Sequence, residues 1–202
     1  TNGSVTSNGG ILQFGNASTA AGAVFNFRPY ANVTQPHFRV SGSAGNAITL
    51  ATSYGSTTNF RILSLYIDVN KTFDIRSIGG AVGDSKTMTL MTTCNGVEAL
   101  YNAGTFQQRL STVTFNTSGA QAIGGPNTTT FYNLSINNAS HITLNKATNV
   151  TNFLTMVNGK LLTTNANVLT CTSTASATIG SSTSYVDGPM VHTVASAALT
   201  AR

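Results

Sequence analysis

Charged residues are scarce in this sequence. Only 7% of its 202 residues are Asp, Glu, Lys or Arg, whereas an ordinary soluble domain has about 25%. Five residues are acidic, and the ten cations are spread from Arg28 to Arg202 without a run of Lys or Arg. The net charge of +5 therefore reflects a shortage of acids rather than a basic patch. Nucleic-acid binding needs clustered cations, so we expect no nucleic-acid partner.

Long apolar runs and helical patterns are absent as well. No run approaches the roughly 18 apolar residues of a membrane-spanning helix, so we expect no transmembrane segment. No window of about 11 residues repeats apolar positions with the helical period without an interrupting Gly, Asn or Thr. The hydrophobic fraction of 41% argues against disorder, which goes with low hydrophobicity and high charge.

Cysteine is nearly absent, and neither Cys94 nor Cys171 belongs to the C-x-x-C motif of metal and redox sites. Two interpretations stay open. The two thiols pair in a disulfide if the fold brings them together, or each is a small core side chain. The histidines His37, His141 and His192 also lack a second His or Cys at metal-ligand spacing.

Alternation of apolar and polar residues, the pattern of a half-buried β-strand, is abundant. In the longest example, RILSLYIDVNKTFDI, one face carries Leu63, Leu65, Ile67, Val69, Phe73 and Ile75. Shorter examples are Met88 with Leu90, Tyr132 with Leu134 and Ile136, Ile142 with Leu144, and Leu154 with Met156. Each pattern predicts one buried side and one solvent-facing side.

Gly and Asn separate these strands, as at Gly79-Gly80, Asn95-Gly96 and Asn158-Gly159, and both tolerate the positive φ of turns. Asn-Gly also suits a two-residue hairpin, so an all-β sandwich is an alternative. A parallel β-helix or β-solenoid is favoured. In the second half, apolar stretches of about four to six residues recur at a spacing near twenty, which is compatible with one coil of a stacked β-helix.

Four segments of the second half share this pattern of short apolar stretches separated by Gly, Asn and Ser. They are TVTFNTSGAQAIGG (112–125), TTFYNLSINNASHITL (129–144), TNFLTMVNGKLLTTNANVLT (151–170) and SYVDGPM (184–190). In these segments the chain, from Ser111 onward, resembles the repeats of very large cell-surface adhesins of the Bacteroidetes, the gliding and biofilm type exported by the type IX secretion system. The first half resembles that family only in its general composition and pattern, without a matching motif.

The resemblance implies a solenoid on the surface of a Gram-negative cell, with a role in attachment or gliding or as a filament stalk. It carries over no functional residue. We therefore expect a β-rich segment, 1–110, that forms the first coils, and a repeat-like solenoid segment, 111–202, that continues into a longer parent chain. The expected partners are an extracellular surface or polysaccharide, or neighbouring domains or subunits of the same filament.

Catalysis would need carboxylates, and the chain has five: Asp68, Asp74, Asp84, Glu98 and Asp187. Asp68 and Asp74 share the outward parity of one strand region, so they could approach each other or a calcium ion. Solvated charges on an exposed face are the favoured interpretation. We expect no enzyme, no catalytic residue and no cofactor, with calcium as the one alternative. The enzyme alternative is a polysaccharide lyase or hydrolase that uses these carboxylates with the nearby Lys71 or Arg76.

Exposed tyrosines are the candidate ligand contacts, because sugars stack on flat rings with polar tips. The candidates are Tyr30, Tyr54, Tyr66 and Tyr101, for which core or rim packing is the alternative. A carbohydrate-binding module is thus a further hypothesis. An ice-binding module would present T-x-T at the same place in every coil, a repeat that the sequence does not display.

Overall fold

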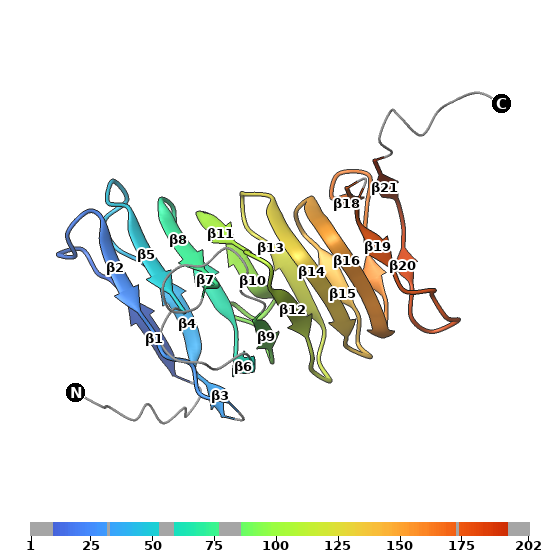
Figure 1. Ribbon diagram of the computed structural model, residues 1–202, viewed down its shortest axis with the longest axis horizontal. Coiled ribbons are helices and arrows are strands. Elements are labelled where there is room, and N and C mark those ends of the chain that lie inside the picture. The colour runs from blue at the N-terminus through green and yellow to red at the C-terminus, as the bar shows by residue number, and fades with distance from the viewer. Residues whose placement is uncertain (1–9, 32, 53–58, 77–85, 173, 194–202) are drawn as a thin grey trace.

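The computed structural model describes residues 10–31, 33–52, 59–76, 86–172 and 174–193. This part of the chain holds 21 β-strands and no helix, and all its strand pairs are parallel. The strands stack into a β-solenoid of about seven turns (Figure 1). The predicted solenoid is therefore confirmed, and the sandwich alternative is wrong, because β-sandwiches are built from antiparallel strands. No helix in the described residues could cross a membrane.

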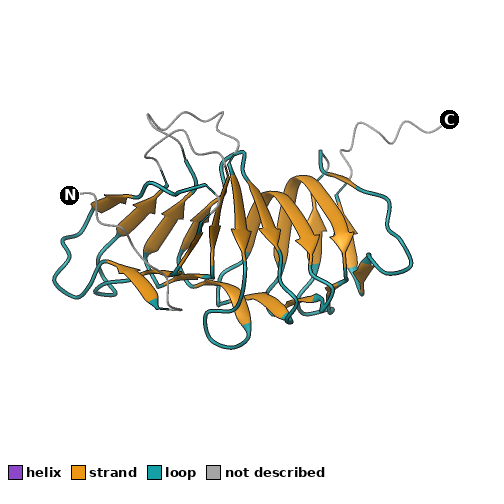
Figure 2. Cartoon of the chain, turned by 90° about the horizontal axis from the view of Figure 1, so that it is seen from below, coloured by secondary structure: helices purple, strands orange, loops and turns teal. Residues whose placement is uncertain are grey.

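Each turn of the solenoid passes through up to three parallel sheets, in which the strands lie side by side along the axis (Figure 2). Sheet A contains β1 (Ile11–Phe14), β4 (His37–Val40), β7 (Leu65–Ile67), β10 (Glu98–Asn102), β13 (Gln121–Gly124), β15 (Ile142–Leu144), β17 (Leu161–Leu162) and β20 (Val186–Asp187). Sheet B contains β2 (Ala23–Asn26), β5 (Ile48–Ala51), β8 (Lys71–Asp74) and β11 (Thr105–Gln107). Sheet C contains β3 (Thr34–Gln35), β6 (Asn59–Ile62), β9 (Thr87–Leu90), β12 (Thr112–Phe115), β14 (Thr129–Asn137), β16 (Thr148–Asn158), β18 (Leu169–Cys171), β21 (Met190–His192) and β19 (Ser176–Ala177), which pairs with β16.

Sheets B and C merge in the middle of the molecule. Strands β14 and β16 are nine and eleven residues long, and their pairing shifts register between Phe131 and Asn133. After the shift, β14 pairs with β12 and continues sheet C. Before the shift, the Phe131 ring lies 5.5 Å from that of Phe106 on β11, the last strand of sheet B. One bent strand thus replaces two shorter ones.

The merger shortens the coils. In the first half, in-register partners on sheet A are 26 positions apart at Leu12 and Phe38 and 35 positions apart at Leu65 and Leu100. In the second half the spacing is 21 at Gln121 and Ile142, then 19 from Ile142 to Leu161. The spacing near twenty that the sequence predicts is therefore confirmed on sheet A for the coils from Gln121 to Leu161, whereas the last pair, Leu161 and Val186, is 25 positions apart.

The core is a set of apolar rows that run along the axis. On sheet A the row of Phe38, Leu65, Leu100 and Ile123 is fully buried. On sheet B the rings of Phe73 and Phe106 stack with centroids 6.1 Å apart. Burying one such side chain contributes about 1.5–3 kcal/mol. Because each coil covers its neighbours, the coils stabilise one another rather than themselves.

The alternation predicted over residues 61–75 is interrupted at two corners. At the first, between the end of β6 on sheet C and β7 on sheet A, Ser64 is fully buried although the alternation placed it outside. The second is the turn between β7 and β8 on sheet B, at which Asn70 has a φ of 58°. Val69 lies in that turn and is 52% exposed, although the alternation placed it inside. At a corner between two sheets, the alternation of buried and exposed side chains is interrupted, and it restarts in the next strand. For the same reason Phe131, not Tyr132, is buried at the register shift of β14.

The Asn-Gly pairs form corners between sheets rather than hairpins. Asn158-Gly159 joins β16 of sheet C to β17 of sheet A, and Gly159 has a φ of 76°. A Cβ at Gly159 would lie 1.8 Å from the carbonyl oxygen of Asn138 in the preceding coil. Glycine is therefore required there both by its φ and by the close contact between coils.

Lys71 is a fully buried cation on β8. Its ammonium group donates hydrogen bonds to the carbonyl oxygens of Asn46, Val69 and Ser43 at 2.7, 3.0 and 2.9 Å. Three donors meet three acceptors, which is the full capacity of an ammonium group. Lys71 thus pins together the two turns that lead from sheet A to sheet B in successive coils.

The disulfide alternative is not realised, because Cys94 and Cys171 are both free thiols. Cys94 follows β9, whereas Cys171 ends β18, four strands further along sheet C. Four strand spacings amount to about 19 Å, while a disulfide needs Cα atoms within about 7 Å. Cys171 is a small core residue, as the second interpretation predicts.

Candidate binding face on sheet A

A row of outward-facing side chains crosses sheet A along the solenoid axis. In-register pairing aligns Gln13, Arg39, Tyr66, Tyr101 and Gly124 on five successive strands. The residues on either side of Arg39 and Tyr66 within their strands point into the core and are buried. The row is therefore the solvent-facing half of the same alternation that builds the core.

Tyr66 and Tyr101 stack in the centre of this row. Their ring centroids are 4.3 Å apart, and the ring planes differ by 12°. Burial, followed by the hydrogen bond and charge of the neighbouring Tyr101, raises the pKa of Tyr66 to about 12. The Tyr66 phenol therefore stays a neutral hydrogen-bonding group at physiological pH.

Arg39 holds one end of the tyrosine stack. Its guanidinium carbon lies 4.9 Å from the centroid of the Tyr66 ring. The same group donates to the Asp68 carboxylate through Nε and Nη2 at 3.2 and 3.1 Å. A two-pronged pair fixes the plane of the guanidinium group, so the stack of Arg39 and the two rings is held in one geometry.

Glu98 covers the other end of the row, above Gly124. A Cβ at Gly124 would lie 2.7 Å from Cγ and Oε1 of Glu98, so the missing side chain makes room for this carboxylate. The side-chain amide of Asn145 donates to Oε1 at 3.0 Å, and that of Asn95 donates to Oε2. Two amides from different turns therefore hold the carboxylate in place.

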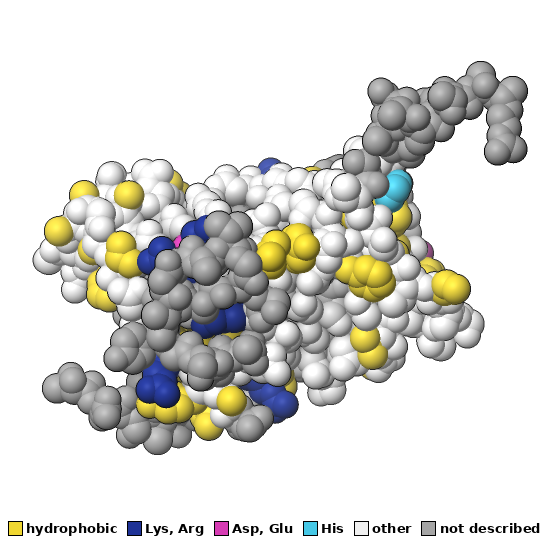
Figure 3. Space-filling model, viewed as in Figure 1, with side chains coloured by type: hydrophobic (Ala, Val, Ile, Leu, Met, Phe, Trp, Pro, Cys, Tyr) yellow, Lys and Arg dark blue, Asp and Glu magenta, His cyan; other side chains and the backbone are white. Residues whose placement is uncertain are grey.

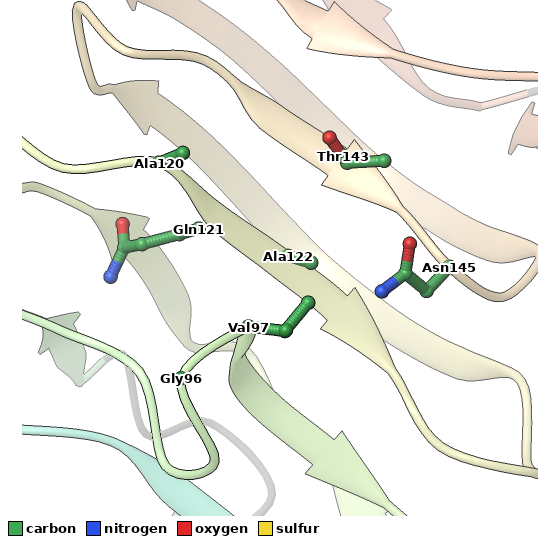
Figure 4. Close-up of a pocket in the computed structure, with 7 residues that line it drawn as sticks. All are labelled: Gly96, Val97, Ala120, Gln121, Ala122, Thr143 and Asn145. Carbon is green, nitrogen blue, oxygen red and sulfur yellow. The ribbon is translucent and has the colours of Figure 1, made fainter.

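Beside Glu98 lies an open hollow of about 300 Å³, lined by Gly96, Val97, Ala120, Gln121, Ala122, Thr143 and Asn145. Figure 4 shows Val97 next to Ala122 and the amide of Asn145 turned toward them, whereas Gln121 points away. The hollow exists because Gly96, Ala120 and Ala122 have little or no side chain. It combines an apolar floor with hydroxyl and amide groups at its edge.

A second hollow, of about 100 Å³, lies at the Arg39 end and is lined by Ile11, His37, Phe38, Arg39, Tyr66 and Cys94. Nδ1 of His37 and the hydroxyl of Ser64 share a hydrogen bond of 2.7 Å, and the Cys94 thiol donates to the carbonyl oxygen of Glu98 at 3.0 Å. Burial lowers the pKa of His37 and raises that of Cys94 to about 11. The thiol is therefore protonated at neutral pH, and the fully buried Ser64 is out of reach of a substrate, so this group lacks an activated nucleophile.

The alternative in which Asp68 approaches Asp74 is not realised. The favoured interpretation, solvated charges on an exposed face, is wrong for Asp74, whose side chain is 5% exposed. Asp68 pairs with Arg39 on sheet A, while Asp74 ends β8 on sheet B and pairs with Arg109. Asp187 pairs with Lys160 at 3.0 Å, and Asp84 lies outside the described residues. Within the described residues, no three His, Cys, Asp or Glu side chains lie close enough together to hold a metal ion.

Comparison of the chain with protein-family models, curated proteins and solved structures gives no match. Of the four candidate tyrosines, the fold brings Tyr66 and Tyr101 together on sheet A. Tyr30 is 57% exposed between β2 and β3, and Tyr54 lies outside the described residues.

Sequence reasoning missed Arg39, Asn145 and the position of Glu98 in the site. These residues are far apart in the chain, and only the register of the coils brings them into one row. The usable signal is a polar or aromatic residue flanked by buried apolar ones, as in Phe38-Arg39-Val40 and Leu65-Tyr66-Ile67. Aligning these triplets before aligning whole repeats would have found the row.

Proposed function

We propose that this chain is a non-catalytic, adhesive solenoid segment of a bacterial cell-surface protein, and that sheet A holds an extended polysaccharide along the solenoid axis. The observation that carries the proposal is the continuous stripe formed by Arg39, the stacked Tyr66 and Tyr101, and Glu98, which leads into the hollow beside Asn145. We call these residues and the hollow the sheet A stripe.

The length of the stripe favours a polymer over a small molecule. It runs from β4 through β7, β10 and β13 to β15, which at about 4.8 Å per strand is roughly 19 Å. A monosaccharide would occupy only a fraction of that length. Several sugar residues in a row would use the ring edges, the carboxylates and the hollow together.

The chemistry of the stripe favours a sugar. A sugar ring has apolar C–H faces and a rim of hydroxyl groups, and the hollow pairs Val97 and Ala122 with Thr143 and Asn145. Aromatic rings with polar tips serve the same dual purpose. The side chains are already held in place by contacts within the protein, so binding would cost little ordering entropy.

The pairing of the carboxylates supports a binding role over the lyase or hydrolase alternative. Asp68 and Asp74 each receive a two-pronged arginine, and Glu98 is held by two amides. Glycosidases place two carboxylates on either side of the glycosidic bond that is cleaved. Here each of the three carboxylates is instead bound to its own partners within the protein. The stacked coils also suit a stalk, because within the described residues the end strands β1 and β20 of sheet A each pair along one edge and leave the other edge for neighbouring coils.

Pull-down on a panel of insoluble polysaccharides, including chitin, cellulose, xylan and mannan, tests this function. We expect the chain to bind at least one of them. Ala120→Phe, which places a ring over the hollow, and the double variant Tyr66→Ala/Tyr101→Ala should each weaken that binding about tenfold or more.

Ala17→Phe and Tyr30→Ala are the matched controls, because both alter exposed positions away from sheet A and should bind like the native chain. Absence of binding to every polysaccharide, or equal binding by the sheet A variants, would overturn the proposal. Release of new reducing ends from the bound polymer would instead establish the enzyme alternative.

A further inference from the structure

Glu98 differs from the other carboxylates that the structure describes, because it has no cationic partner. Asp68, Asp74 and Asp187 each form an ion pair with Arg or Lys, at 3.1, 2.8 and 3.0 Å. Glu98 belongs to none of the ion pairs among the described residues, and both of its oxygens accept hydrogen bonds from neutral amides. Its negative charge is therefore not neutralised by the part of the chain that the structure describes.

Such a carboxylate is unusual in this protein, which has ten cations against five acids and a net charge of +5. On the face that Figure 3 shows, Lys and Arg side chains are prominent in the left half, whereas Asp and Glu side chains are barely visible. The sheet A stripe differs. Together with Asp68, the partner of Arg39, it has one positive and two negative charges, which leaves a net charge of −1.

The turn before Glu98 fixes the position of this carboxylate. The side-chain oxygen of Asn95 accepts hydrogen bonds from the backbone N–H groups of Val97 and Glu98 at 3.1 and 2.8 Å. The N–H group of Cys94 donates to the carbonyl oxygen of Glu98 at 2.6 Å. The amides of Asn95 and Asn145 then hold the two carboxylate oxygens. A ligand would meet a preorganised charge, so little ordering entropy would be lost on binding.

The Glu98 carboxylate can accept further hydrogen bonds. An ionised carboxylate has about four lone-pair positions, and the two amides occupy two of them. The side chain is half-buried and lies beside the open hollow, whose lining includes Val97 and Asn145. A group bound in the hollow is therefore within reach of the carboxylate.

A cation is the group that such a carboxylate binds best. Hydrogen bonds between two charged groups are shorter than those between neutral groups and roughly twice as strong. Lys146 follows Asn145 in the chain, but no ion pair within the described residues joins it to Glu98. An anionic ligand would be repelled by Glu98, and a neutral one would leave the charge unpaired.

We propose that the sheet A stripe selects a polysaccharide with free amino groups, and that the Glu98 carboxylate binds the ammonium group of one sugar residue. This inference rests on the proposed function of the stripe. The apolar face of the sugar ring packs on Val97 and Ala122, and its hydroxyl groups bond to side chains at the edge of the hollow. N-acetylation removes the positive charge and enlarges the substituent, so the acetylated sugar should bind more weakly.

Two linear hexasaccharides that differ only in N-acetylation test the inference: hexaglucosamine and its fully N-acetylated counterpart. Isothermal titration calorimetry of the native chain, at a mildly acidic pH at which the sugar amino groups are protonated, measures both affinities. We expect hexaglucosamine to bind at least about tenfold more tightly, as a hydrogen bond between charged groups predicts. A chain with a net charge of +5 repels cations as a whole, so nonspecific attraction cannot produce this preference.

The salt dependence of binding needs no variant. Raising NaCl from about 50 to about 200 mM should weaken hexaglucosamine binding about twofold or more, because salt screens a partly exposed charge pair. Binding of the acetylated hexasaccharide should not change. Equal salt dependence of the two sugars would contradict an ammonium group bound to Glu98.

Glu98→Gln is the decisive variant, because it keeps the length of the side chain and removes its charge. The preference for hexaglucosamine should fall from about tenfold to about twofold or less. Asp187→Asn is the matched control. It removes one negative charge from an exposed residue of sheet A, four strands away from β10, and should keep the preference. Circular dichroism checks that both variants fold.

Equal affinity of the native chain for the two hexasaccharides, or an unchanged preference in Glu98→Gln, would overturn this inference and leave the proposed function to its own pull-down test. Loss of the preference in both variants would also overturn it, since net charge would then be responsible. Tighter binding of hexalysine than of hexaglucosamine would assign the carboxylate to a basic peptide instead. If neither hexasaccharide and no polysaccharide of the panel binds, the proposed function fails together with the inference.

Discussion

Arg109 lies in the coil after that of Asp74 and donates two hydrogen bonds to its carboxylate, with Nε and Nη2 each 2.8 Å from one oxygen. The Asp74 side chain is 5% exposed. To reach it, Arg109 adopts a φ of 50°, which costs a non-glycine residue roughly 1 kcal/mol or more. The hydrogen bond to Asp74 raises the pKa of Arg109 further. This pair clamps the end of β8 to the loop after β11.

We expect Arg109→Met to lower the free energy of unfolding by about 2–3 kcal/mol, because it leaves a buried carboxylate without its main partner. Urea unfolding followed by circular dichroism measures the loss. The matched control is Arg39→Met, whose ion pair with Asp68 is more exposed and should cost at most about 1 kcal/mol. Similar losses in both variants would contradict the clamp.

Lys71→Met should destabilise the fold by about 3 kcal/mol. The substitution keeps an unbranched side chain in the core but removes the three hydrogen bonds to Ser43, Asn46 and Val69, and buried carbonyl groups left without donors are costly. Lys146→Met, at a partly exposed site, is the comparison and should change stability by less than about 0.5 kcal/mol. Unchanged stability of Lys71→Met would show that these turns do not need the cation.

Gly159→Ala should cost about 2 kcal/mol or more, because the new Cβ would sit 1.8 Å from the Asn138 carbonyl oxygen at a φ of 76°. Gly119→Ala is the control, since nothing lies within 4 Å of its Cβ position. Thermal unfolding of the two variants side by side gives the difference. If Gly119→Ala lowered the stability as much as Gly159→Ala, the loss would come from a general stiffening of the chain and not from the contact between coils.

Cys94 should react slowly with iodoacetamide in the folded protein. At pH 8, a thiol pKa of about 11 instead of 9.0 reduces the thiolate fraction, and hence the rate, about 100-fold. Because burial raises this pKa, the stabilisation from the protonated thiol is complete below about pH 9. It is lost as pH rises from about 9 to about 11. Alkylation in a Cys171→Ser background, with and without urea, measures the protection; equal rates would refute it.

The sequence predicts the strands well but their corners poorly. The alternation at Leu65 and Ile67 reads correctly because one face of β7 packs on the core. It fails at Val69, where the chain leaves sheet A and the two-residue period restarts. Corners are fixed by contacts between coils, such as that of Lys71 with Asn46, and a local pattern contains no information about them.

The candidate site depended even more on register. Tyr66 and Tyr101 were identified as candidates by their chemistry, yet their stacking follows from an interval of 35 residues, whereas Arg39 and Tyr66 are separated by 27. Intervals this unequal do not appear as a repeat.

The parallel stacking of the coils also has a mechanical consequence. Since β1 and β20 lie at opposite ends of sheet A, a pull along the axis loads the end coils first and detaches them one at a time. Partners 19 residues apart at Leu161 and 35 apart at Leu100 imply that each step releases about 65–120 Å of extended chain. A solenoid built this way yields in stages under a sudden load, and the remaining coils stay folded while it does.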